Sequence, residues 1–153
     1  VHADSLRKAD VKVKGMLSLE MIGYFSDEAG SQNYPGSPEL QEYLKAQYGD
    51  KGNFIAIIGT EFSKRWIGEV AQGMQAHTDG LKVHPFVPPP GVDLSDVLRS
   101  DHINYQGWPN AMVNNTGPYR NKGYHTQKDT LDTLKLDQTA KVIKGLAGFL
   151  SKQ

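Results

Sequence analysis

The chain has 153 residues, with 17 acidic and 17 basic side chains that leave no formal net charge, and it contains no cysteine. This length fits one domain with a sizeable core. The charge balance, without a basic stripe of interleaved aromatic residues, argues against nucleic acid as a partner. The lack of cysteine excludes disulfides and thiolate metal sites. No apolar run approaches the length of a membrane span, so no membrane partner is expected.

The first third of the chain predicts one helix, one strand and a long excursion. Residues 2–10 have the apolar spacing of a helix. A strand is predicted over 11–22, because alternating valines and lysines lead into a nearly continuous apolar run. Residues 26–52 are rich in Gly, Pro, Ser and Asn and predict an inserted loop region with one helical turn near 38–46. Loops of this length are often functional.

The rest of the chain alternates strands with helices. Short β-branched or apolar runs predict strands at 54–58, 81–87 and 110–114. Between the first two of these strands lies a helix, capped by Thr60 or Ser63. We expect the inward face of that helix to carry Ile67, Val70, Ala71 and Met74.

The last predicted element is a helix over 137–151. We expect Asp137 to cap it. We expect its inward face to carry Ile143, Leu146, Ala147 and Leu150. Alternating strands and helices predict an α/β fold, part of a three-layer sandwich with a mixed, largely parallel sheet.

Two local oddities suggest a metal site. Glu20 lies inside an apolar run, where a charge is costly unless it is paired or bound to metal. His125 and Asp129 follow the strand predicted at 110–114, and imidazole and carboxylate are ligands that zinc takes. A cation shared by Glu20 and His125 would explain both. The alternatives are a solvent-facing Glu20 and a surface or structural histidine.

Four motifs follow one another in an order that resembles the M28 family of zinc aminopeptidases, to which glutaminyl cyclases are related. They are SLEMIGY (18–24), PGVDLSD (90–96), SDHINY (100–105) and YRNKGYHTQKDTLDTL (119–134). The resemblance runs from about His2 to the C-terminus, but it matches only the C-terminal part of the family's catalytic domain. We therefore expect residues 1–153 to be the C-terminal portion of a single peptidase domain, processed or truncated before Val1.

The resemblance implies roles for individual residues. Glu20 and His125 fall where the family has metal ligands, and Tyr124 where some members stabilise the oxyanion. Asp101 would orient a ligand or the substrate amine, or else hold a polar turn. Further candidates for substrate binding, with structural roles as their alternatives, are Arg120, Asn121 and His102.

The resemblance also implies partners and cofactors. The complete domain would hold two zinc ions and act on the N-terminal peptide bond of a peptide substrate. The family's other ligands and its general-base Glu lie upstream of the matching region, so this chain alone should bind zinc weakly or not at all and be inactive. Its expected partner is the missing N-terminal half or an oligomeric partner. Many relatives are secreted or periplasmic, which favours export.

Two other functions stay open at this point. The chain could be a metal-free remnant that acts as a binding or structural module, or a fragment of a glutaminyl-cyclase-like acyltransferase. The peptidases fit better, because the cyclases generally have Trp where Tyr124 stands. The chain departs from the family pattern at two places: the stretch from His102 to Ala111 is shorter, and residues 114–116 are Asn-Asn-Thr where the family commonly has Thr-Asp-Thr.

Overall fold

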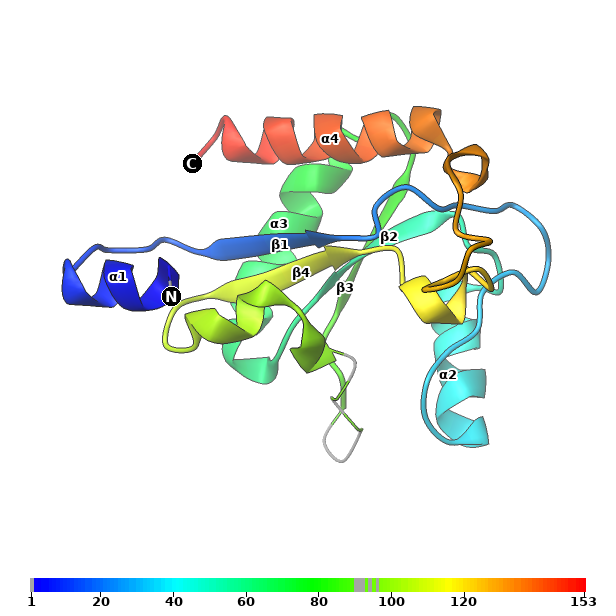
Figure 1. Ribbon diagram of the computed structural model, residues 1–153, viewed down its shortest axis with the longest axis horizontal. Helices are drawn as coiled ribbons and strands as arrows, with labels where there is room; N and C mark the ends of the chain where they lie inside the picture. Colours follow the sequence, from blue (N-terminus) through cyan, green and yellow to red (C-terminus); the bar gives the residue numbers. More distant parts are fainter. Residues whose placement is uncertain (1, 90–92, 94, 96) are drawn as a thin grey trace.

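The computed structural model describes residues 2–89, 93, 95 and 97–153 (Figure 1). Most of the PGVDLSD motif therefore lies outside the described residues. The helices and strands are α1 (His2–Lys8), β1 (Met16–Glu20), α2 (Pro38–Tyr48), β2 (Phe54–Ile58), α3 (Lys64–Gln75), β3 (Lys82–Phe86), β4 (Asn110–Asn114) and α4 (Leu136–Leu150).

The four strands form one mixed sheet in the order β1-β4-β2-β3. The β1–β4 and β2–β3 pairs are parallel, and the central β2–β4 pair is antiparallel. Helices flank this sheet (Figure 1). The predicted α/β class with a mixed, mostly parallel sheet is confirmed, and the strand over 54–58 has its predicted bounds.

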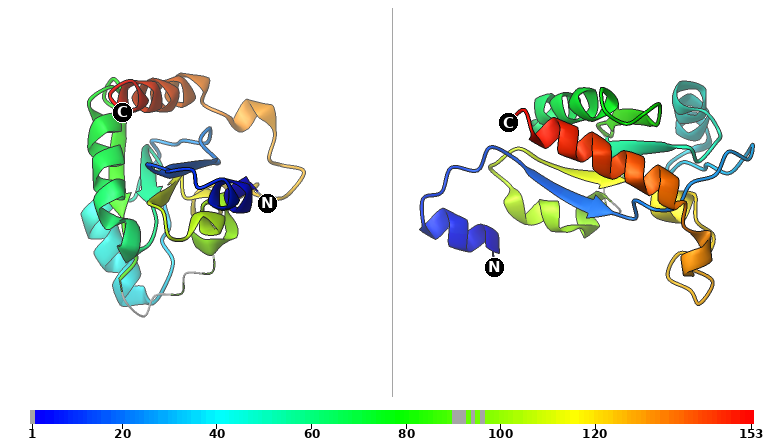
Figure 2. Two further views of the ribbon diagram at one scale, coloured as in Figure 1. Left: turned by 90° about the vertical axis from the view of Figure 1, so that its left-hand side faces the viewer. Right: turned by 90° about the horizontal axis from the view of Figure 1, so that it is seen from above.

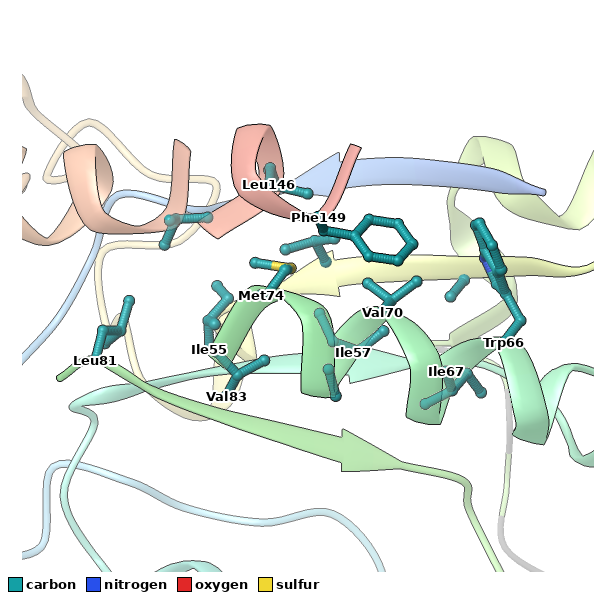
Figure 3. Packing of buried hydrophobic residues seen from close by; sticks show 14 of the residues in the cluster. Ile55, Ile57, Trp66, Ile67, Val70, Met74, Leu81, Val83, Leu146 and Phe149 are labelled. Atoms are coloured by element: carbon teal, nitrogen blue, oxygen red, sulfur yellow. The ribbon is translucent and has the colours of Figure 1, made fainter. Parts of the chain in front are cut away.

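Helices α3 and α4 cover one face of the sheet (Figures 2 and 3). Strand β2 is buried on both faces, and its side chains alternate between them as the pleat requires. Ile55 and Ile57 point into the core under α3 and α4, which we call the helix-covered core. Trp66 of α3 and Phe149 of α4 meet edge to face with centroids 5.6 Å apart, which joins the two helices above the sheet.

The opposite face of the sheet, which we call the open face, carries a smaller apolar cluster. Its buried members are Phe54, Ala56 and Ile58 of β2, together with Met112 of β4. Partly buried side chains pack against them from α2, from β3 and from the long connections: Tyr48, Phe86, Tyr34 and Val97. Within the described residues, no helix is long and apolar enough to cross a bilayer.

Two expectations about the elements near β1 and α2 need correction. The strand predicted over 11–22 is confined to Met16–Glu20, and Val11 is exposed. Residues 11–14, in which valine and lysine alternate, do not pair with β4, because β4 pairs only with residues 16–20. The single turn predicted near 38–46 is an eleven-residue helix, started by Pro38 and by Ser37, whose hydroxyl accepts from the Leu40 amide.

The predicted caps and buried faces of α3 and α4 are only partly confirmed. On α3 the predicted inward face is confirmed, but neither Thr60 nor Ser63 makes a side-chain cap. On α4 only Leu146 of the predicted face is buried, and the helix begins one residue before Asp137. Apolar residues lie on both sides of α4, so two registers fitted the sequence. The buried set is Val142, Gly145, Leu146 and Phe149.

Candidate functional site

A cavity of about 330 Å³ lies against the open face of the sheet. Three of the predicted site residues line it: Glu20, Tyr124 and His125. Glu20 is the last residue of β1, and the other two lie in the segment that follows β4, the neighbour of β1 in the sheet. Strand pairing thus brings together residues more than one hundred positions apart in the sequence.

Glu20 is half-buried and fixed by a hydroxyl that the sequence reasoning did not single out. Ser100 Oγ lies 2.6 Å from Glu20 Oε1 and 2.8 Å from Ser18 Oγ. Ser18 and Glu20 share one face of β1 because successive strand residues alternate. Ser100 opens the SDHINY motif, so its place in that motif was the available signal.

His125 is exposed and stands in a tight turn with its backbone in the left-handed region, at φ 57°. Its ring stacks on that of Tyr124, with centroids 3.8 Å apart and planes inclined by 19°. Hydrogen bonds from the Tyr124 amide to Asn121 O and from the Thr126 amide to Gly123 O fold the chain on either side. The turn therefore holds the two rings as a pair at the cavity wall.

Asn121 lies outside the cavity lining and braces this turn. Its Oδ1 accepts from the Gly123 amide at 2.8 Å, and its Nδ2 donates to Asp129 Oδ1 at 2.9 Å. These two bonds tie together the residues before and after His125. The amide is thus committed to the turn in this structure.

Arg120 is buried and joins several connections. Its guanidinium donates to the Phe54 carbonyl at 2.9 Å and to Gln32 Oε1 at 2.8 Å, and it lies 4.6 Å from the centroid of the Phe54 ring. Burial lowers its pKa to about 9. Arg120 does not line the cavity, and its contacts anchor the excursion after β1 to the start of β2.

Asp101 and His102 begin a short 3₁₀ helix, Asp101–Tyr105, and neither lines the cavity. Asp101 is exposed. His102 is fully buried, and no described residue hydrogen-bonds either of its ring nitrogens. Burial lowers the pKa of His102, although the nearby carboxylates of Glu20 and Asp101 act in the opposite direction.

The predicted ligands form a partial donor set. Glu20 and His125 offer one carboxylate and one imidazole to the same cavity, which are donor types that suit zinc. Among residues 2–89, 93, 95 and 97–153, no group of three or more His, Cys, Asp or Glu could hold a metal ion. Two donors fall short of the three protein ligands typical of a catalytic zinc site.

His84 is a cavity residue that the sequence did not indicate. It lies on β3, with its ring 5.0 Å from those of both Tyr48 and Phe54. Burial, and secondly Lys82, lower its pKa. Its position on a strand ended by prolines gave no hint of a site, because only the fold places β3 and α2 on the same cavity.

No known protein-family model matches the chain. It is 37% identical over 157 residues to "Uncharacterized protein YfbL" of Escherichia coli (strain K12), an alignment that covers 98% of this chain and 44% of that protein. The chain thus spans less than half the length of this curated relative.

Solved structures with a similar fold are aminopeptidases. One is the crystal structure of Legionella pneumophila LapA aminopeptidase, with a TM-score of 0.60 and 18% identity, covering 99% of this chain and 35% of that one. Another LapA crystal structure has a TM-score of 0.57 and 15% identity, covering 99% and 36%. At such identity the likeness establishes the fold alone: an α/β domain with the architecture of part of an aminopeptidase.

Proposed function

We propose that this chain is part of a zinc-dependent exopeptidase of the M28 type that removes N-terminal residues from peptides. The observation that carries the proposal is the single cavity lined by Glu20, Tyr124 and His125. These are the two residues predicted as ligands and the residue predicted to stabilise the oxyanion. Glu20 lies more than one hundred positions before Tyr124 and His125 in the sequence, yet all three line one cavity.

Glu20 and His125 would each hold zinc through a carboxylate oxygen and an imidazole nitrogen. The Ser100 hydroxyl would orient the carboxylate through its hydrogen bond to Oε1, and the Asn121–Asp129 hydrogen bond would hold the turn that carries the imidazole. Bound zinc would supply Lewis acidity and lower the pKa of a coordinated water. The remaining ligands and the general base would come from protein outside this chain.

The residues of this chain have two further tasks in the proposed reaction. Tyr124 would donate its phenol proton in a hydrogen bond to the oxygen that gains charge as the peptide carbonyl is attacked. Asp101, exposed at the start of its 3₁₀ helix, would orient a ligand or the substrate amine. The chain alone would be inactive. Strand β1 is an edge of the sheet and its Leu19 is 52% exposed, so the proposed partner, the missing N-terminal half or a second copy, has a surface to pack on.

The test uses the longer protein that contains this chain, assayed with aminoacyl amides in the presence and absence of a zinc chelator. We expect zinc-dependent hydrolysis that is lost in His125→Ala. Tyr124→Phe should lower kcat more than it raises KM, because the lost hydrogen bond belongs to the transition state. Tyr43→Phe, on the exposed face of α2, is the matched control. A kcat unchanged by Tyr124→Phe would remove Tyr124 from the reaction, and hydrolysis that persists in His125→Ala would refute the ligand assignment.

The isolated 153-residue chain gives a second test. Incubated with zinc and the same amides, it should show no turnover. Zinc-dependent turnover that is lost in the His125→Ala chain would show that the ligand set is complete without a partner, and would overturn the proposed division of the site.

A further inference from the structure

We propose that the end of the cavity farthest from Glu20 is a pocket for an aromatic side chain, and that Ala56 sets its depth. The identity of the ligand as the N-terminal residue of a peptide rests on the proposed function. The pocket itself rests on the walls described below, and it can be tested without metal or catalysis.

The cavity spans the whole width of the sheet. Glu20 lies on β1, one edge strand, while His84 and Phe86 lie on β3, the opposite edge strand, and all three line the cavity. Three strand spacings separate these edges, or about 14 Å at the usual distance between strands. A ligand held at the Glu20 end by its backbone atoms could therefore direct its side chain toward β3.

The walls of this far end are rings and aliphatic carbon. Phe54, His84, Phe86 and Tyr48 form one aromatic group, in which neighbouring ring centroids lie 5.0 to 6.2 Å apart at tilted or edge-on angles. Such spacings and angles are those that aromatic pairs prefer, and a further ring could continue the arrangement. This chemistry selects a flat aromatic side chain.

The two phenol groups near these rings already have partners in the chain, whereas Nε2 of His84 is buried with no hydrogen-bond partner among the described residues. The Tyr34 hydroxyl donates to Gly49 O at 2.8 Å, and the Tyr48 hydroxyl donates to Pro85 O at 3.4 Å. Burial raises the pKa of Tyr34 to about 12, so its phenol is neutral. Helix α2 and strands β2 and β3 contribute no carboxylate, ammonium or guanidinium group to the described lining. A charged side chain seated among these rings would lose its hydration, and the charged residues of the described lining, Glu20, Asp93 and Arg99, come from other segments of the chain.

Ala56 has the smallest side chain among the strand residues that line the cavity. It stands between Phe54 and Ile58 on the same face of β2 and lines the cavity. A larger residue at this position would project into the space above the sheet. It would leave the Glu20 end intact, because Glu20 is on another strand.

The experiment titrates the 153-residue chain with L-phenylalaninamide, L-alaninamide and the α-amide of L-glutamate, with no metal added. Binding is followed by NMR at the Met112 methyl group and the His84 ring protons. We expect saturable shifts at both residues with the phenylalanine amide only. Ala56→Leu should weaken its affinity about tenfold or more, which is what a few misplaced methyl groups cost in an apolar pocket. Ala46→Leu, the same change on the exposed side of α2, should not.

No shift at Met112 or His84, equal binding of the three amides, or equal affinity in Ala56→Leu and Ala46→Leu would overturn the pocket. Should Ala56→Leu lose the spectrum of a folded protein, Ala56→Val is measured in its place with the same criterion. The pocket and the proposed function also fail separately. Binding without hydrolysis by the longer protein refutes the function, whereas zinc-dependent hydrolysis without this binding refutes the pocket.

Discussion

The two faces of strand β2 serve different purposes. Ile55 and Ile57 are 0% exposed beneath α3 and α4, in a packed core. One residue away along the same strand, Ala56 lines a cavity of about 330 Å³. Native cores are packed nearly without voids, so the cavity side of β2 has fewer packed contacts than the side beneath the helices. The helix-covered core therefore supplies most of the packing, and the open face offers the cavity for the binding proposed above.

The helices explain the difference. Five residues of α3 are buried, but α2 buries only Leu44 in its interior. Most helix stability in proteins comes from the burial of an apolar face. Helix α2 is therefore held weakly in comparison with α3, and we expect the open face to contribute less to the free energy of unfolding.

The first prediction compares one phenylalanine on each face. Phe149→Ala should lower the free energy of unfolding by about 3–5 kcal/mol, because it leaves a cavity in the helix-covered core. Phe86→Ala should cost clearly less, because Phe86 is only partly buried and already borders the open cavity. Urea denaturation of both variants measures the difference. Equal losses would mean that the two faces contribute equally to stability.

The second prediction concerns a residue of the open face that should affect binding rather than stability. In the longer protein, Ser100→Ala should weaken zinc binding about tenfold, since a lost hydrogen bond to a ligating carboxylate typically costs this much. Zinc affinity is measured by competition with a chelator. Ser151→Ala, at the end of α4, removes a hydroxyl far from the site and serves as the control. Unchanged affinity would show that Glu20 needs no support from Ser100.

The third prediction concerns pH and the aromatic wall. The pKa of His84 is lowered in the folded chain, mainly by burial, so below about pH 6.5 the unfolded chain takes up a proton that the folded chain does not. The free energy of unfolding should therefore fall with decreasing pH, by up to about 1.4 kcal/mol per pH unit from this group, until the folded-state pKa is passed.

The variant His84→Phe keeps a ring in place and removes the titration. Its free energy of unfolding should fall less between pH 7 and pH 5 than that of the parent chain, as measured by urea denaturation at each pH. Phe62→Leu, at an exposed ring that carries no titrating group, should leave the slope as it is and serves as the control. A slope that His84→Phe does not alter would contradict the lowered pKa.

Much of the fold was predictable because its signals are local. The strand over 54–58 and the buried face of α3 follow from runs and periods that permit one interpretation. The register of α4 was not predictable, since Ile143 and Leu150 are as apolar as Val142 and Phe149, and only the position of α3 decides which set is buried. The extent of β1 depended in the same way on its partner, β4.

The site was predictable only where a motif marked it. Glu20, Tyr124 and His125 were singled out from the sequence, and they do line one cavity; their chemical roles stay predictions. His84 was missed because its place in the cavity comes from contacts across the sheet, which no period or spacing encodes. Ser100 opens a motif, but only the fold shows that its hydroxyl reaches Glu20. The positions of Asp101, Arg120 and Asn121 relative to the cavity depend on turns that the sequence leaves open.

The smallest predicted effect concerns the start of α2. The Ser37 hydroxyl accepts a hydrogen bond from the Leu40 amide, so Ser37→Ala should cost this helix about 1 kcal/mol. If α2 opens independently of the helix-covered core, this cost appears as faster amide exchange within α2, with no change in the exchange of β2 and α3. Ser5→Ala, in α1, gives the matched substitution in another helix. Hydrogen exchange measured by NMR distinguishes local opening of α2 from global unfolding. Uniform acceleration across the chain would show that α2 unfolds only with the whole domain, and that the open face is as stable as the helix-covered core.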